Sequence, residues 1–165
     1  LFSDGIELYI PPKKGRSHVL RIIRELIEFE PESKQTNIAE ALKFLSNVMK
    51  KKAIVFLLSD FMAEEYQHNL KIASGKHDIT GVRVYDKFEA EIPNLGMVQM
   101  EDQETGRSFL VNTASKKVRE NYQKNYQEKL HCFSDSFKKS GAGALDCRID
   151  ESYVKKLLGY FKQRG

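Results

Sequence analysis

Apolar residues along this chain follow two spacings, one typical of helices and one typical of strands. An unbroken apolar run covers residues 53–58, and Ser59 and Asp60 follow it directly. A run this short and uniformly apolar is typical of a strand that is covered on both faces in the middle of a parallel sheet. Asp60 would then follow the carboxyl end of that strand, at the edge where open α/β sheets bind ligands.

Helical spacing of apolar residues predicts five helices around this strand. We expect Ser17 to cap the first helix and Thr36 to start the second, because both residue types are common at helix N-termini. The predicted helices cover residues 17–29, 36–50, 63–73, 115–139 and 152–163.

Further strands are predicted at residues 79–85 and 144–149, and an added hairpin joins 97–100 to 109–111. Residues 1–3 and 6–10 flank the turn signal Asp4-Gly5 and predict an antiparallel hairpin at a sheet edge. Strands that alternate with helices predict an α/β fold with a mostly parallel sheet and helices on both faces. We expect a single domain over residues 1–165, since no repeat or linker divides the chain.

Composition adds few constraints. The hydrophobic content is 41%, the charged content 30% and the net charge +4, which permits an anionic partner without requiring one. No segment approaches the roughly 20 apolar residues that span a bilayer, so no membrane partner is expected.

Cys132 and Cys147 are the two cysteines, and this low number favours the reducing cytoplasm. Because the chain starts at Leu1 in the middle of an apolar segment, we expect it to be a fragment whose upstream part is missing.

Ordered motifs carry a resemblance to a known family. The motifs are Phe2-Ser3-Asp4, Tyr9-Ile10-Pro11-Pro12-Lys13-Lys14-Gly15-Arg16, Thr36-Asn37-Ile38, Leu57-Leu58-Ser59-Asp60-Phe61, His77-Asp78-Ile79, Val84-Tyr85-Asp86, Ile92-Pro93 and Asp102-Gln103-Glu104-Thr105-Gly106. With these motifs in this order, the chain resembles the C-terminal part of a domain-of-unknown-function family 58 protein, which is a bacterial protein with a von Willebrand factor A-like fold.

The resemblance implies a three-layer von Willebrand A-like domain that lacks its first strand and helix and carries an added β-hairpin. It also implies a metal-ion-dependent adhesion site, to which Thr36 and Asp60 would contribute ligands. The Asp-x-Ser-x-Ser motif that completes such sites is absent from this chain. We therefore expect a divalent cation, Mg²⁺ or Mn²⁺, in the full-length parent and none bound to this fragment.

The same resemblance implies a partner, because the genes of such proteins commonly lie beside one for a MoxR-type AAA+ ATPase. We expect a non-catalytic protein–protein interaction module in a chaperone-like assembly, with a rim around the ion that recognises the partner. The expected rim residues are Ser33, Lys34, Gln35, Phe61 and Met62. Loss of a central strand would also leave an exposed sheet edge, so we expect either a homodimer through that edge or disorder around residues 1–15.

Two other functions were weighed. Catalysis is not expected, because no Gly-x-Ser-x-Gly, His-Glu-x-x-His or phosphate-loop motif occurs, and His77 is expected to orient a loop. A basic module for nucleic acid or another polyanion is the alternative, since residues 116–139 carry seven Lys or Arg against three Asp or Glu. Tyr122 and Tyr126 share the apolar stripe of that helix and are expected in the core. The acidic loop 101–104 is expected to be a solvated hairpin tip or a partner surface.

Overall fold

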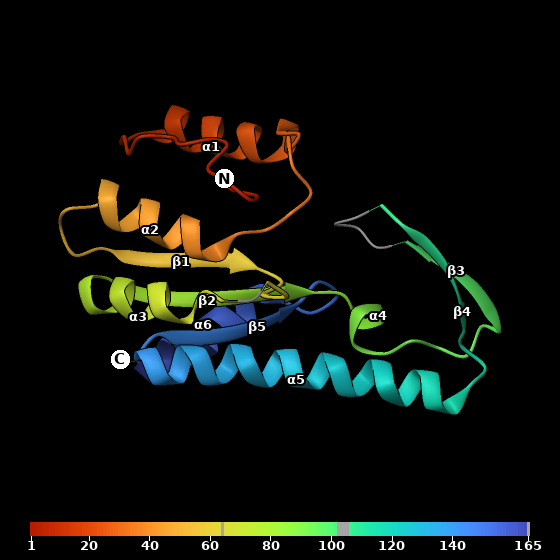
Figure 1. The fold of residues 1–165 in the computed structure, drawn as a ribbon. Coiled ribbons are helices and arrows are strands. Elements are labelled where there is room, and N and C mark those ends of the chain that lie inside the picture. Colours follow the sequence, from red (N-terminus) through yellow and green to blue (C-terminus); the bar gives the residue numbers. More distant parts are fainter. Residues whose placement is uncertain (64, 102–105, 165) are drawn as a thin grey trace.

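A parallel sheet of three strands forms the centre of the molecule. The computed structural model describes residues 1–63, 65–101 and 106–164. The sheet has the order β1-β2-β5, and a separate antiparallel pair, β3-β4, projects from it (Figure 1). The strands are β1 (Ile54–Ser59), β2 (Asp78–Tyr85), β3 (Met97–Glu101), β4 (Ser108–Asn112) and β5 (Gly143–Arg148).

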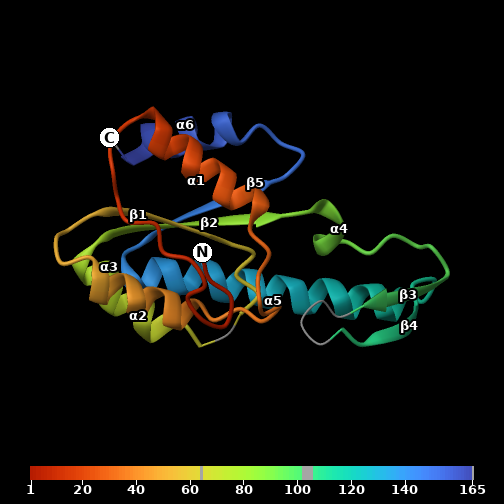
Figure 2. The ribbon, with the colours of Figure 1, turned by 90° about the horizontal axis from the view of Figure 1, so that it is seen from above.

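Helices lie on both faces of this sheet, as Figure 2 shows from above. α2, α3 and α5 lie on one side, and α6 and α1 lie on the other. The predicted α/β class, a parallel sheet flanked by helices with an added hairpin, is therefore confirmed. The helices are α1 (Arg16–Glu28), α2 (Ile38–Val48), α3 (Gln67–Lys76), α4 (Lys87–Ala90), α5 (Lys116–Ser140) and α6 (Tyr153–Arg164).

Parallel pairing brings the carboxyl ends of the three strands to one edge of the sheet. β1 pairs with β2 from Ile54 opposite Asp78 to Ser59 opposite Arg83. β2 pairs with β5 up to Tyr85. Asp60 therefore follows β1 at the same edge where β2 and β5 end.

The core lies between the sheet and the side that carries α2, α3 and α5. Gly81 in β2 faces the Phe137 ring so closely that a Cβ atom would lie 2.4 Å from its Cζ. A larger residue at position 81 would therefore force the Phe137 ring to shift within the core. The buried cluster contains Ile38, Leu42, Leu57, Phe61, Tyr66, Leu70, Ala73, Ile79, Phe133 and Phe137.

The apolar run at 53–58 forms a strand as predicted, but its expected central position with both faces covered is wrong. β1 lies at the end of the sheet and β2 is central. Leu57 is 8% exposed on the core face, whereas Ile54 and Leu58 are 71% and 60% exposed on the other. The reason is that α6 lies mainly against β5 and reaches the outer face of β1 at Phe56, whose ring centroid lies 6.0 Å from that of Phe161. Ile54 and Leu58 therefore stay exposed.

The predicted N-terminal hairpin is also largely wrong, because it is reduced to an isolated bridge between Phe2 and Ile6. A few backbone hydrogen bonds still join Leu1 to Glu7 and Leu8, and side-chain bonds add to them. The Glu7 carboxylate accepts hydrogen bonds from the Ser3 hydroxyl and from the backbone N–H groups of Glu32 and Ser33. These bonds tie the start of the chain to the loop before α2 instead of to a strand.

Helix starts differ from the predictions by a few residues. Ser17 does not cap α1, which begins at Arg16 after Gly15 (φ 107°). Asn37 rather than Thr36 precedes α2, and its side chain accepts a hydrogen bond from the Glu40 N–H. The β3–β4 hairpin confirms the second predicted hairpin, while most of the acidic loop 101–104 lies outside the described residues. Helix α4 was not predicted.

Candidate functional site

The turn that follows β1 presents Asp60 to solvent. Its Oδ1 atom accepts hydrogen bonds from the Met62 N–H at 3.1 Å and from the Ser59 hydroxyl at 3.3 Å. The Ser59 hydroxyl in turn accepts the Phe61 N–H at 3.2 Å. These bonds satisfy the backbone of the turn locally. They use one carboxylate oxygen, so the other remains available to a ligand.

Phe61 determines which way this turn faces. Its φ angle is 56°, a left-handed conformation that costs a non-glycine residue about 1–2 kcal/mol. The ring is 3% exposed and lies 4.5 Å from Phe133 and 5.2 Å from Phe137, measured between ring centroids. The buried ring offsets the backbone strain and anchors the turn. Phe61 was expected at the rim of the site, but its ring lies in the core beneath it.

The loop before α2 provides the neighbouring surface. Figure 1 shows that α2 starts at the end of the molecule where β1 finishes. Thr36 is exposed there, next to Asn37, whose N–H donates to the Ser3 carbonyl at 2.7 Å. The sheet topology therefore brings Thr36 and Asp60 to the same edge of the molecule.

The expected rim residues of this loop differ in their surroundings. Ser33 is partly buried, and its hydroxyl accepts the Gln35 N–H at 3.2 Å. Lys34 and Gln35 are exposed. Met62, on the other side, is partly buried. The accessible polar surface at this edge thus includes Lys34, Gln35, Thr36 and Asp60.

The described residues do not by themselves fit a resident divalent cation. Mg²⁺ prefers six oxygen ligands in near-octahedral geometry, and Asp60 and Thr36 offer one carboxylate and one hydroxyl. Within residues 1–63, 65–101 and 106–164, no group of three or more His, Cys, Asp and Glu side chains is arranged to hold a metal ion. An ion at this edge would need most of its ligands from elsewhere.

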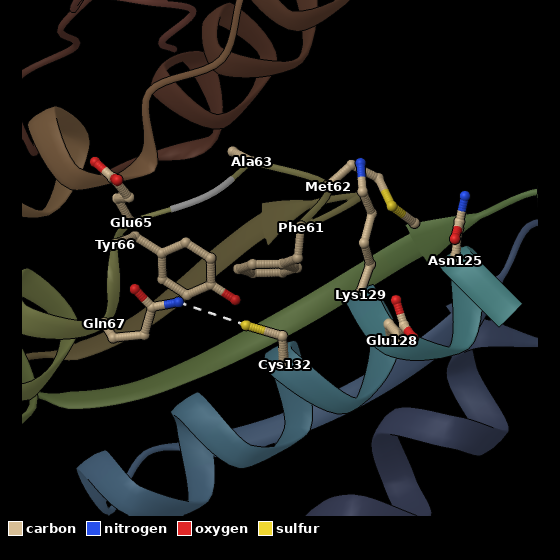
Figure 3. Close-up of a pocket in the computed structure, with 10 residues that line it drawn as sticks. All are labelled: Phe61, Met62, Ala63, Glu65, Tyr66, Gln67, Asn125, Glu128, Lys129 and Cys132. Atoms are coloured by element: carbon tan, nitrogen blue, oxygen red, sulfur yellow. Dashed lines mark hydrogen bonds between the residues drawn. The ribbon is translucent and has the colours of Figure 1, made fainter.

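A hollow of about 500 Å³ lies between the turn after β1 and α5 (Figure 3). Phe61, Met62 and Tyr66 line it from one side. The α5 residues Asn125, Glu128, Lys129 and Cys132 line it from the other, and Gln67 donates to the Cys132 sulfur at 3.5 Å. The sequence patterns do not predict this hollow. The spacing of 125, 129 and 132 places them on one helix face, a signal that the neighbouring apolar stripe obscured.

A buried arginine ties the strands to α5. Arg83 is 3% exposed; its Nε lies 2.5 Å from an Asp146 carboxylate oxygen and its Nη1 lies 2.6 Å from the Tyr126 hydroxyl. Burial opposes the charge of Arg83, but the hydrogen bonds that the guanidinium donates to Tyr126 and Asp146 outweigh burial and raise its pKa. Tyr126 was expected in the core, and this is confirmed. The network stabilises the fold; Arg83 and Tyr126 lie inside the protein, whereas the Asp146 side chain is 47% exposed.

His77 precedes β2 (Asp78–Tyr85), at the opposite end of the strands from Asp60. His77 is 3% exposed, and neither ring nitrogen has a hydrogen-bond partner among the described residues. Its backbone N–H donates to the Ala73 carbonyl at 2.9 Å and ends α3. The expectation that its ring orients a loop is therefore wrong.

Among the described helices, none combines the length and apolarity that a bilayer crossing requires.

Comparison with known sequences identifies the family. The profile described as "Protein of unknown function DUF58" matches residues 1–131. The chain belongs to the DUF58 family. This DUF58 chain is 22% identical over 160 residues to an uncharacterized protein from Mycobacterium avium, covering 94% of the chain and 93% of that relative. It is 21% identical over 170 residues to an uncharacterized protein from Mycobacterium tuberculosis. That match includes 99% of this chain, which spans about half (53%) of the relative's length.

Two solved structures resemble the DUF58 chain at 14% identity. One is described as a conserved hypothetical protein, BatB, from Bacteroides thetaiotaomicron, with a TM-score of 0.47 over 88% of this chain and 67% of that one. The other is described as an aerotolerance-related membrane protein from Bacteroides fragilis, with a TM-score of 0.46 over 90% of this chain and 70% of that one.

Proposed function

We propose that this chain is a non-catalytic protein–protein interaction module that recognises its partner with the surface around Asp60. The observation that carries the proposal is the turn itself. A residue with a strained backbone and a buried ring, Phe61, holds Asp60 outward at the carboxyl edge of a parallel sheet, where ligands of such sheets bind. The surface therefore has a rigid support and an available carboxylate.

The family resemblance supplies the finer parts of the proposal. A von Willebrand A-like domain would use Asp60 and Thr36 in a metal-ion-dependent adhesion site, with Mg²⁺ or Mn²⁺ as the cofactor of the full-length parent. The two oxygen ligands of this chain are too few to hold such an ion tightly. The isolated chain is therefore expected to show no magnesium or manganese binding at micromolar concentrations of the metal, and a titration that finds such binding contradicts this part.

The proposed partner is a MoxR-type AAA+ ATPase, which the resemblance names and which would form a chaperone-like assembly with this module. The partner's contacting surface should carry groups that complement the exposed polar residues Lys34, Gln35 and Asp60. Recognition then depends on charge and on hydrogen bonds to the turn, rather than on any chemical step.

The experiment compares the affinity of the ATPase for the full-length parent and for two variants. Asp60→Ala should weaken binding by at least about tenfold if the bound partner buries Asp60, since truncating one member of a buried, hydrogen-bonded charge pair commonly costs 2–5 kcal/mol. Asp86→Ala is the matched control. Asp86 follows β2 and its Oδ1 accepts the Phe88 N–H at 2.8 Å, so this variant removes a similar turn without touching Asp60.

Repeating the comparison with a chelator separates the two parts of the proposal. Loss of wild-type binding in the chelator supports an ion at the interface, whereas unchanged binding supports direct recognition by Asp60. If Asp60→Ala binds as tightly as the wild type, the surface assignment is wrong. If both variants lose binding equally, the loss reflects the altered edge in general, and the role given to Asp60 is again wrong.

The alternative is a basic module for nucleic acid or another polyanion, which would use α5. Three of its lysines face carboxylates at i,i+4 spacing, in the pairs Lys116–Glu120, Lys124–Glu128 and Lys139–Asp135. Such pairs reduce the positive potential that phosphate binding needs. Polyanion binding that falls steeply between low and high salt would favour this alternative.

A further inference from the structure

The hollow between the turn after β1 and α5 adjoins the surface proposed for the partner. Met62 lines the hollow, and its backbone N–H donates to Asp60 Oδ1 at 3.1 Å. Phe61 and Tyr66 line the hollow from the same side, and their rings are buried. A partner that covers Asp60 therefore reaches the hollow along the same turn.

Tyr66 carries a buried hydroxyl that lacks a hydrogen-bond partner. The residue is 1% exposed, and its hydroxyl bonds to no group of the described chain. The Ser136 hydroxyl lies nearby but donates to the Cys132 carbonyl at 2.6 Å. Figure 3 shows the Tyr66 hydroxyl directed toward Cys132, on the α5 side of the hollow. Because a buried hydroxyl without a partner is unfavourable, one hydrogen bond is left here for an occupant to make.

The α5 wall of the hollow adds a cation and an amide. Lys129 is exposed and belongs to none of the ion pairs that α5 forms among the described residues. Figure 3 shows the Lys129 side chain extending from α5 toward the turn. Asn125 lies one helical turn earlier on the same wall and is exposed as well. The ammonium and the amide N–H groups are hydrogen-bond donors.

The two carboxylates of the lining do not balance these donors. Glu128 lies 3.9 Å from the Lys124 ammonium, so its charge is already paired. Glu65 is exposed, and Figure 3 shows its carboxylate directed away from the Tyr66 ring. The hollow therefore combines an aromatic floor with the Tyr66 hydroxyl and the Lys129 ammonium, two donors that have no acceptor among the described residues.

We propose that the hollow receives an acidic side chain of the partner protein. The methylene stem of that side chain lies against the Phe61 ring, and its carboxylate accepts hydrogen bonds from the Tyr66 hydroxyl and the Lys129 ammonium. A basic side chain would face Lys129 as a like charge and would offer the Tyr66 hydroxyl no acceptor. The inference rests on the proposed function, because it gives the chemistry of the partner segment that binds next to Asp60.

The test compares the affinity of the MoxR-type ATPase for the full-length parent and for three variants. Tyr66→Phe keeps the ring and removes the hydroxyl, and Lys129→Ala removes the cation. Each should weaken binding by about tenfold, because both donors bond to a charged acceptor. Lys117→Ala is the matched control and should bind as the wild type does. Lys117 is also exposed on α5 and lies about 18 Å along the helix from Lys129.

Unfolding in urea separates a role in recognition from a role in folding. The Tyr66 hydroxyl has no partner in the free protein, so Tyr66→Phe should be at least as stable as the wild type at neutral pH, although it binds the ATPase less tightly. A clear loss of stability in Tyr66→Phe would mean that the hydroxyl already has a partner, and the inference would be wrong.

Cys132 gives an independent measurement, because its exposed thiol lines the hollow. ATPase at ten times its Kd should slow the reaction of Cys132 with N-ethylmaleimide about tenfold, since only the free fraction then reacts. A thiol introduced by Lys117→Cys should react at the same rate with and without the ATPase.

The outcomes separate this inference from the proposed function. If Asp60→Ala weakens binding while Tyr66→Phe and Lys129→Ala bind as the wild type does, the assignment of the hollow alone is wrong. An unprotected Cys132 in the complex overturns the same assignment. If Asp60→Ala also binds as tightly as the wild type, or if the wild type does not bind the ATPase, the proposed function is wrong and the inference falls with it.

Discussion

Phe61 offers the most direct test of how the turn after β1 is supported. Truncating a buried phenylalanine to alanine costs about 3–5 kcal/mol, a large part of the 5–15 kcal/mol that typically separates folded from unfolded domains. The Phe61 ring is 3% exposed and contacts Phe133, Phe137 and Tyr66 at centroid distances of 4.5, 5.2 and 6.0 Å. We therefore expect Phe61→Ala to lower the free energy of unfolding by an amount in this range.

Glycine at the same position separates the ring from the backbone. With a φ of 56° at residue 61, alanine retains about 1–2 kcal/mol of left-handed strain, and glycine does not. Phe61→Gly should therefore be no less stable than Phe61→Ala. The control variants are Phe133→Ala and Phe133→Gly, because Phe133 is 2% exposed and lies within α5. In a helix, glycine should make the protein about 1 kcal/mol less stable than alanine does.

Urea unfolding followed by circular dichroism measures all four variants, with stability taken from the midpoint at a common slope. The reasoning is refuted if Phe61→Gly is about 1 kcal/mol less stable than Phe61→Ala, as expected at Phe133. It is also refuted if Phe61→Ala loses less than about 1 kcal/mol, since the ring would then not anchor the turn.

Three other substitutions test the packing and electrostatics by the same unfolding measurement. Gly81→Ala should lower the free energy of unfolding by about 1–3 kcal/mol, because the new Cβ atom would lie 2.4 Å from the Phe137 ring. Gly75→Ala in α3 is the control: nothing lies within 4 Å of its Cβ position, so it should stabilise the protein by about 0.4–1 kcal/mol. Equal effects of the two substitutions would contradict the close approach of Gly81 to Phe137. Asp146→Ala should lower the free energy of unfolding by about 1–3 kcal/mol. This loss is smaller than for a fully buried ion pair, because the Asp146 side chain is 47% exposed. The double variant Asp146→Ala, Arg83→Met should lose less stability than the sum of the two single variants. Burial raises the pKa of Tyr66. The stability that depends on its neutral hydroxyl is therefore complete below the unfolded pKa of about 10 and falls as the pH rises above that value. Tyr66→Phe should remove this loss of stability at alkaline pH, and an unchanged pH profile of stability would contradict the burial of the hydroxyl.

Much of the fold follows from local patterns. The alternation of helical and strand spacing predicted the parallel sheet, the β3–β4 hairpin and the long helix α5, because each has several residues of periodic signal. The position of a strand within the sheet does not follow in the same way. The run at 53–58 is equally apolar whether one or both faces are covered, so its place at the edge depends on which strands pair with it.

The site was predictable only in part. Asp60 was assigned to the carboxyl end of a strand from sequence alone, and its exposure agrees with that assignment. The inward direction of Phe61 depends on a backbone angle that no residue type signals. Arg83 and Asp146 became partners only through the register of β2 with β5, which is a long-range property.

Hydrogen–deuterium exchange of the full-length parent, with and without the MoxR-type ATPase, tests the central claim most directly. The proposal predicts slower exchange on binding in peptides that cover residues 59–62 and 33–37, with little change over α6. Protection confined to α6 and β5, with residues 59–62 unaffected, would contradict the proposed recognition surface.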